Sequence, residues 1–264
     1  MSYRITKTFF NNKKKLITFI TGGDPNFETS KKIIKTIVEN GADIIEIGIP
    51  FSDPMADGPT IQLSSTRAIK QGINLDHIFS ICKDLRNTNN DIPIILMGYY
   101  NVVFHYGLEK FVYECQQNGI DGLIIVDLQP EEDPELLSAI QSTDLDLIRL
   151  IAPTTNSKRL EKILKNSSGF LYYVTITGIT GQKSVNLADL KQSITNIKNK
   201  TKLPVVSGFG IKNREQVKKV CKISDGAVVG SSIVKIIENN INNENKMIAL
   251  VANFVKQLKE SIIK

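Results

Sequence analysis

One stretch of the sequence, residues 44–59, combines carboxylates with a rigid backbone in a way that suits acid/base chemistry. Glu46 lies in the middle of a continuous apolar run, and Asp53 and Asp57 follow in the next loop. A charge inside a buried strand is costly unless it has a partner or a task. The pattern predicts an acid/base pair on a rigid scaffold; the alternative is a structural Glu46 paired with an Arg or Lys. The loop is fixed by turn-forming residues, namely Pro50, Pro54, Gly58 and Pro59.

Two glycine-containing turns in the last third of the chain predict a binding site for phosphate. Ser207-Gly-Phe-Gly210 and Gly230-Ser-Ser232 each follow a short apolar run and precede a helical pattern. Glycines let backbone N–H groups approach an anion, and helix N-termini favour negative charge. The alternative is that these glycines only make tight turns. The candidate phosphate residues are Gly208, Gly210, Gly230 and Ser231.

Two further features bear on a ligand. The segment Thr177-Gly-Ile-Thr-Gly-Gln-Lys183 suggests a mobile lid whose N–H groups also reach the phosphate, although an ordinary flexible loop has the same composition. Aromatic residues stand near the ends of expected strands, where together they would form a flat apolar slot for an aromatic group; each alone is more often a core residue. They are Phe19, Tyr99, Tyr172 and Phe209.

Short apolar runs alternate with amphipathic segments along the whole sequence, which predicts an α/β fold. The expected strands cover residues 16–21, 43–49, 92–97, 122–127, 146–151, 171–176, 204–207 and 226–229. The expected helices cover residues 27–39, 61–71, 76–85, 108–117, 134–141, 157–165, 187–197, 213–221, 231–238 and 246–262. Eight β-then-α units without a boundary indicate a (β/α)₈ TIM barrel, a single domain over residues 1–264 with an extra N-terminal helix. In such barrels the chemistry lies at the carboxyl ends of the strands, where Glu46 and Asp57 belong.

Composition narrows the classes of function. The net charge of +6 is spread over Lys-rich helices, and no basic patch with interleaved aromatic residues or zinc pattern supports nucleic-acid binding. Cys82, Cys115 and Cys221 are far apart and form no CxxC motif, which fits a reduced, intracellular protein, and the two isolated His residues argue against a catalytic zinc site. No apolar run approaches the length of a membrane span or forms a signal peptide. We expect a soluble intracellular protein, in a bacterial cytoplasm or a plastid stroma, without a targeting segment.

The sequence resembles the tryptophan synthase alpha subunit family along its whole length. The longest motif is Glu46-Ile-Gly-Ile-Pro-Phe-Ser-Asp-Pro-Met-Ala-Asp-Gly-Pro59. Shorter matches follow in the family's order: Thr21-Gly-Gly-Asp-Pro25, Tyr100-Asn101, Asp127-Leu128, Ala152-Pro-Thr154, Thr177-Gly-Ile-Thr-Gly181 and Ser207-Gly-Phe-Gly210. The resemblance implies a lyase that cleaves indole-3-glycerol phosphate into indole and glyceraldehyde 3-phosphate. It also implies an alpha2beta2 complex with a beta subunit that holds pyridoxal phosphate, so that this chain itself needs no cofactor and no metal.

Roles carry over from the family by motif. Glu46 would be the general acid/base, and Asp57 would face the indole N–H. The residues that would hold phosphate are Thr180, Gly181, Gly208, Gly210, Gly230 and Ser231. The residues that would flank the indole are Phe19, Tyr99 and Tyr172.

The chain departs from the family pattern at one position. Gln129 stands where the family usually has Pro after Asp127-Leu128, in a loop that lies at the face between subunits in the family. The sequence also leaves several functions open. A standalone indole-releasing lyase would share the same catalytic residues. A different phosphosugar barrel, such as an epimerase or a phosphoribosyl isomerase, and a non-catalytic phosphate-binding barrel that activates a partner stay open as well.

Overall fold

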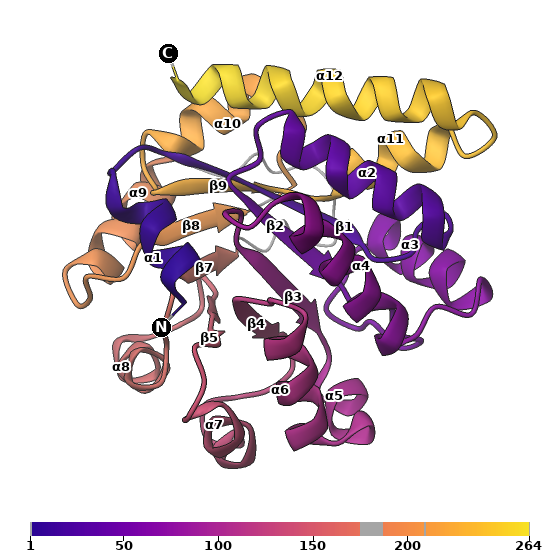
Figure 1. The fold of residues 1–264 in the computed structure, drawn as a ribbon. Helices are drawn as coiled ribbons and strands as arrows, with labels where there is room; N and C mark the ends of the chain where they lie inside the picture. The colour runs from indigo at the N-terminus through magenta and orange to yellow at the C-terminus, as the bar shows by residue number, and fades with distance from the viewer. Residues whose placement is uncertain (1, 175–186, 209, 264) are drawn as a thin grey trace.

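The protein, described from a computed structural model, alternates strands and helices through residues 2–174, 187–208 and 210–263, the part of the chain that the structure describes (Figure 1). The strands are β1 Lys15–Thr21, β2 Ile44–Gly48, β3 Ile94–Gly98, β4 Gly122–Ile125, β5 Asp146–Leu147, β6 Arg149–Ile151, β7 Leu171–Val174, β8 Val205–Gly208 and β9 Gly226–Val229. The helices are α1 Tyr3–Phe10, α2 Phe27–Glu39, α3 Pro59–Lys70, α4 Leu75–Thr88, α5 Tyr100–Tyr106, α6 Leu108–Gln117, α7 Pro134–Ile140, α8 Ser157–Lys165, α9 Leu187–Lys198, α10 Arg214–Cys221, α11 Ser231–Asn239 and α12 Glu244–Ile263.

The strands form one parallel sheet that closes into a barrel. Their order is β5-β4-β3-β2-β1-β9-β8-β7-β6, so the two ends of the sheet are β5 and β6. These two strands are consecutive pieces of one chain segment, separated only by Ile148, whose N–H donates to the carbonyl of Leu123 at 2.9 Å. The segment 146–151, expected as one strand, is therefore split, and its two halves pair with opposite sides of the sheet. The predicted (β/α)₈ barrel is confirmed.

The inside of the barrel is filled by β-branched and aromatic side chains. Because side chains alternate between the two faces of a strand, each strand sends one set of residues inward and the other toward the helices. Helix α1 adds Ile5 and Phe9 to this inner core and closes the amino end of the barrel, which is the extra N-terminal helix expected from the sequence. The inner core contains Ile17, Ile44, Ile95, Ile124, Ile148, Phe170, Val206 and Val228.

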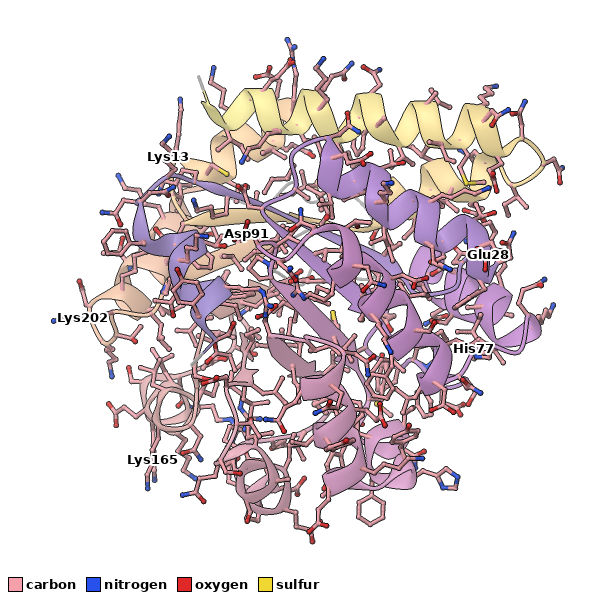
Figure 2. All side chains as sticks on the ribbon, viewed as in Figure 1. Lys13, Glu28, His77, Asp91, Lys165 and Lys202 are labelled. Atoms are coloured by element: carbon pink, nitrogen blue, oxygen red, sulfur yellow. The ribbon has the colours of Figure 1, made fainter. Side chains whose placement is uncertain are left out.

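Outside the barrel, the amphipathic helices bury their apolar stripes against the other face of the strands. Ile45 and Ile47 of β2 belong to this outer layer together with Ile33, Ile34 and Ile37 of α2. Helix α12 lies across α2, α10 and α11 at the top of Figure 1. Polar and charged side chains project from the outer surface, as His77, Glu28 and Lys165 do in Figure 2.

One helix was not among the expected elements. Helix α5 begins at Tyr100, just after β3, where the sequence pattern predicted no element. The element has only seven residues and is too short for a helical period to stand out from the sequence. The end of the strand expected at 171–176 lies outside the described residues. Among the helices of the described part, none is both long and apolar enough to cross a membrane.

A network of buried charges ties the amino end of the barrel together. Asp121, almost completely buried, precedes β4 and accepts from Arg86 Nη2 of α4 at 2.6 Å, from Ser2 Oγ at 2.7 Å and from the Ile94 N–H at 2.9 Å. Arg4 Nη1 lies 3.1 Å from the same carboxylate. Every ionised group of this network thus has a partner, which is the condition for burying charge.

Removing one member of this network should destabilise the fold strongly. Arg86→Met leaves Asp121 buried without its main counter-ion, and we expect the free energy of unfolding to fall by about 3–5 kcal/mol. Arg214→Met is the matched control, because Arg214 is exposed and its only ion pair among the described residues is with its neighbour Glu215, at 3.5 Å; its effect should stay within about 0.5 kcal/mol. Urea denaturation of both variants makes the comparison, and equal effects would contradict a stabilising role of the network.

Candidate active site

Glu46 lies on the inner face of the barrel wall, two residues beyond the core residue Ile44 toward the carboxyl end of β2. It lies in β2 between Phe19 of β1 and Ile95 of β3, and strand alternation turns it inward together with Ile44 and Gly48. Its side chain is completely buried, and neither carboxylate oxygen has a hydrogen-bond partner among the described residues. Burial raises the pKa of Glu46 to about 8. Within the described chain no Arg or Lys pairs with it, so the alternative of a structural ion pair has no support there.

Asp57 lies in the loop between β2 and α3 and is held by Tyr99. The Tyr99 hydroxyl donates to Asp57 Oδ2 at 2.9 Å and accepts from the Ala56 N–H at 3.0 Å. Burial raises the pKa of the Asp57 carboxyl, and the hydrogen bond from Tyr99 partly offsets this rise. Asp53, by contrast, is exposed and accepts from the neighbouring Ser52 Oγ at 2.9 Å. Of the two loop carboxylates, Asp57 is therefore the one fixed in place.

Phe19 and Tyr172 lie near Glu46. Phe19 is its register neighbour in β1, and the Glu46 carboxylate contributes to raising the pKa of the Tyr172 hydroxyl, although burial contributes more. The rings need glycine backbone beneath them. A Cβ at Gly48 would come within 2.6 Å of Phe19 Cζ, and one at Gly208 would collide with the Tyr172 hydroxyl. The sequence reasoning found both rings but not the reason for these two glycines.

Tyr99 was expected only to flank the aromatic ring of a ligand, but it also binds Asp57. It follows β3 and its ring lies 5.1 Å from that of Phe51, centroid to centroid, so that it packs against the Asp57 loop as well as binding it. Sequence reasoning missed the Tyr99–Asp57 bond because the two residues are far apart in the chain. The one signal in the sequence was that Asp57 follows β2 and Tyr99 follows β3, and these two strands are neighbours in the sheet.

The glycine turns lie at the carboxyl ends of β8 and β9. Gly208 ends β8, and Gly210 adopts a left-handed conformation with φ of +53°. Gly230 is the N-cap of α11 and offers no side-chain cap, while the exposed Ser231 begins the helix. The first N–H groups of a helix have no partner within it, so this end can accept an anion. Thr180 and Gly181 of the expected lid, and Phe209, lie outside the described residues.

The described chain offers neither a reactive cysteine nor a metal site to this chemistry. Burial raises the pKa of the Cys82 and Cys221 thiols to about 12, which keeps them protonated. No group of three or more His, Cys, Asp or Glu residues in the described ranges has the arrangement of a metal site.

The arrangement suits acid/base chemistry on a ring-bearing phosphate ester. Glu46 gains or loses a proton near neutral pH, and Asp57 presents a held carboxylate at the same end of the barrel. Phe19, Tyr99 and Tyr172 supply aromatic surface around them. The uncapped end of α11 supplies the place for an anion.

Comparisons with known proteins agree on one family. The family model described as tryptophan synthase alpha chain matches residues 6–263. A tryptophan synthase alpha chain of Citrifermentans bemidjiense is 44% identical over 252 residues, which cover 96% of this chain and 93% of that protein. The crystal structure of tryptophan synthase subunit alpha from Legionella pneumophila superposes with a TM-score of 0.92 at 35% identity, covering 100% and 99% of the two chains. A chain of Mycobacterium tuberculosis tryptophan synthase in its aminoacrylate-bound form gives 0.86 at 28% identity, covering 98% and 99%.

The raised pKa of Glu46 predicts how stability depends on pH. Between the usual carboxyl pKa of 4.5 and about 8, the folded protein keeps a proton that the unfolded chain releases. The free energy of unfolding should therefore fall as the pH rises through this window, by up to about 1.4 kcal/mol per pH unit from this group, and level off above it. Glu46→Gln removes this dependence.

The measurement is urea denaturation of Glu46→Gln and the unmodified chain at about pH 5, 6.5 and 8, the window that linkage defines. The variant should gain stability relative to the unmodified chain as the pH rises. Glu215→Gln, at an exposed position of α10, is the control and should show no such trend. A Glu46→Gln difference that is constant across the three pH values would show that Glu46 ionises alike in both states.

Proposed function

We propose that the chain, which belongs to the tryptophan synthase alpha chain family, cleaves indole-3-glycerol phosphate into indole and glyceraldehyde 3-phosphate. The observation that carries the proposal is Glu46, a fully buried carboxyl group without a partner in the described chain, at the carboxyl end of the barrel. A group so costly to bury marks a functional site. The reaction belongs to tryptophan biosynthesis and makes the chain a lyase.

Glu46 would carry both proton transfers of the cleavage. A retro-aldol reaction protonates carbon 3 of the indole and removes the proton of the hydroxyl on the attached carbon. The carbon–carbon bond then breaks, its electron pair returns to the ring, and the hydroxyl carbon becomes the aldehyde. A carboxyl group with its pKa raised to about 8 is available in both protonation states near neutral pH. Each such transfer contributes typically about 10²–10⁴-fold to the rate.

Asp57 would stabilise the positive charge that develops on the ring nitrogen. Protonation of carbon 3 turns the indole into a cation whose N–H is a strong donor, and an ionised carboxylate held in position lowers the energy of that state. The hydrogen bond from Tyr99 favours the ionised form of Asp57 and fixes its direction. Tyr99 would thus act on both the ring and the carboxylate.

The rest of the substrate would be held by its two ends. Phe19, Tyr99 and Tyr172 would flank the indole, since aromatic side chains offer a flat apolar surface to a ring. The phosphate would bind at the end of α11, through the N–H groups around Gly230 and Ser231 and those of Gly208 and Gly210. Thr180 and Gly181 would complete this grip by the family motif.

The partner would be a tryptophan synthase beta subunit. That subunit would hold the pyridoxal phosphate, and this chain would bind no cofactor. A chain of Mycobacterium tuberculosis tryptophan synthase is among the similar structures. In this chain, Met55 of the Asp57 loop is 86% exposed and Phe104 of α5 is 60% exposed. Met55 follows β2 and Phe104 follows β3, so both lie in segments at the carboxyl end of the barrel. Large exposed apolar side chains are typical of protein interfaces.

Gln129 would lie beside this interface without disrupting its loop. Its Oε1 accepts from Arg159 Nη2 of α8 at 3.1 Å, and the neighbouring Glu131 forms an ion pair with the same arginine. The loop after β4 is thereby attached to α8 in the absence of the family's usual proline. The bacterial relatives favour a bacterial cytoplasm over a plastid stroma as the site of the reaction.

The test of the function is release of indole from indole-3-glycerol phosphate by the purified chain, alone and with a pyridoxal-phosphate beta subunit. We expect slow release that rises sharply with the partner, because an alpha subunit works within a complex. Fast release without the partner would indicate a standalone lyase instead. No release in either condition would overturn the catalytic proposal and favour a phosphate-binding barrel.

Glu46→Gln should separate catalysis from binding. The amide is close to the carboxyl group in size but cannot transfer the proton, so indole release should fall by at least about 10²-fold. Binding of glycerol 3-phosphate, measured by calorimetry, should stay nearly unchanged, because the end of α11 is untouched. Parallel loss of both properties would show that Glu46 has a structural role.

A further inference from the structure

Helix α3 is attached to the exit of β1 at three successive positions on one face. Residues three apart lie on the same side of a helix, and here each faces a residue of β1 or of the loop after it. The contacts are apolar nearest the barrel, then hydroxyl to hydroxyl, then ionic. The pairs are Ile61 with Phe19, Ser64 with Thr21 at 2.5 Å between Oγ and Oγ1, and Arg67 with Asp24.

The ionic contact is the strongest of the three. Arg67 Nε and Nη2 lie 2.7 and 2.8 Å from Asp24 Oδ1 and Oδ2, the bidentate geometry that arginine forms with carboxylates. Asp24 is 1% exposed, and burial raises its pKa while Arg67 lowers it. The Asp24 carboxylate therefore depends on Arg67, and the Nε and Nη2 edge of the guanidinium is occupied by this carboxylate rather than by a ligand anion.

The other end of α3 carries Asp57. The helix begins at Pro59, and its N-cap Gly58 follows Asp57 directly. Gln62 in the first turn donates from Nε2 to the Asp57 carbonyl at 2.9 Å. A shift of α3 against β1 would therefore move the Asp57 main chain, while its side chain stays attached to Tyr99 after β3.

We propose that Arg67 is a positioning residue for Asp57: by fastening α3 to the loop after β1, it holds the Asp57 carboxylate where the developing charge needs it. This inference rests on the proposed function for its catalytic consequence. Misplacing a reacting group by about 1 Å can cost on the order of 10²-fold in rate. A contact as far from the reacting atoms as that of Arg67 can therefore affect the rate.

The phosphate end does not depend on Arg67 to the same degree. Helix α11 packs on Phe19 through Val234, and Gly230 lies against the same side chain. Its contact with Arg67 is long, 3.9 Å to Glu238, and Glu238 has a closer partner in Lys235 at 2.8 Å. Weakening the ion pair of Arg67 with Asp24 should therefore displace Asp57 and leave the first turn of α11 in place. General destabilisation of the fold would affect both.

The experiment combines Arg67→Lys with Asp57→Asn in a double-mutant cycle, using the chain with its beta subunit. Lysine keeps the charge but loses the fork, and we expect kcat to fall about tenfold, with KM and the Kd for inorganic phosphate changed by less than about threefold. In the Asp57→Asn background the same substitution should have little further effect on kcat. Lys70→Met, one turn further along α3 at an exposed position, is the control and should leave kcat unchanged.

Hydrogen exchange of the chain provides a readout that does not depend on activity. Arg67→Lys should speed exchange of the segment that contains Ala56 and Asp57, whose N–H groups bond to Tyr99 and to Pro54, but not of the first turn of α11. Asp24→Asn serves as a second variant and should reproduce both results.

Additive effects on kcat, or equal loosening of α11, would overturn the positioning role. No indole release by the unmodified chain would count against the proposed function alone, since the exchange result would still decide whether Arg67 holds the loop.

Discussion

The burial of Glu46 without a partner in the described chain is the constraint on which the site depends. A carboxylate in such a place is unstable as an ion, so burial raises its pKa into the range where it exchanges protons near neutrality. The closed sheet makes this possible, because β1 and β3 cover both edges of β2 and helices cover its outer face. An open sheet edge at β2 would admit water and return Glu46 to an ordinary acid.

The neighbours of Glu46 follow from the same geometry. Strand alternation that turns Glu46 inward also turns Gly48 inward two residues later, and the absent side chain leaves the space that the Phe19 ring occupies. Gly208 in β8 does the same for Tyr172. The two glycines thus leave room for the two aromatic rings near the carboxyl group. Asp57 comes from a loop rather than a strand, and for that reason it needs Tyr99 to hold its side chain.

Sequence reasoning reached the barrel and the candidate residues because both leave local signals. Apolar runs of four to seven residues between amphipathic segments mark parallel strands, and Glu46 is visible as a charge in one of them. Contacts between distant residues leave no such signal: Tyr99 with Asp57 and Arg67 with Asp24 are set by which strands become neighbours. The break at Ile148 was missed for the same reason, since it reflects closure of the barrel rather than the composition of residues 146–151.

Asp121 and Glu46 are both buried carboxyl groups of the barrel, but they differ in their bonding. At the amino end, Asp121 is surrounded by Arg86, Arg4, Ser2 and a backbone N–H, so its ionised form is fully bonded. At the carboxyl end, Glu46 lacks any described partner, and its ionisation costs stability. If Glu46 were paired in the same way, the barrel would be more stable but would lack the acid whose pKa lies near neutrality. The bonded network at the amino end therefore offsets part of the cost of burying Glu46, and α1 takes part in that network through its N-cap Ser2 and through Arg4.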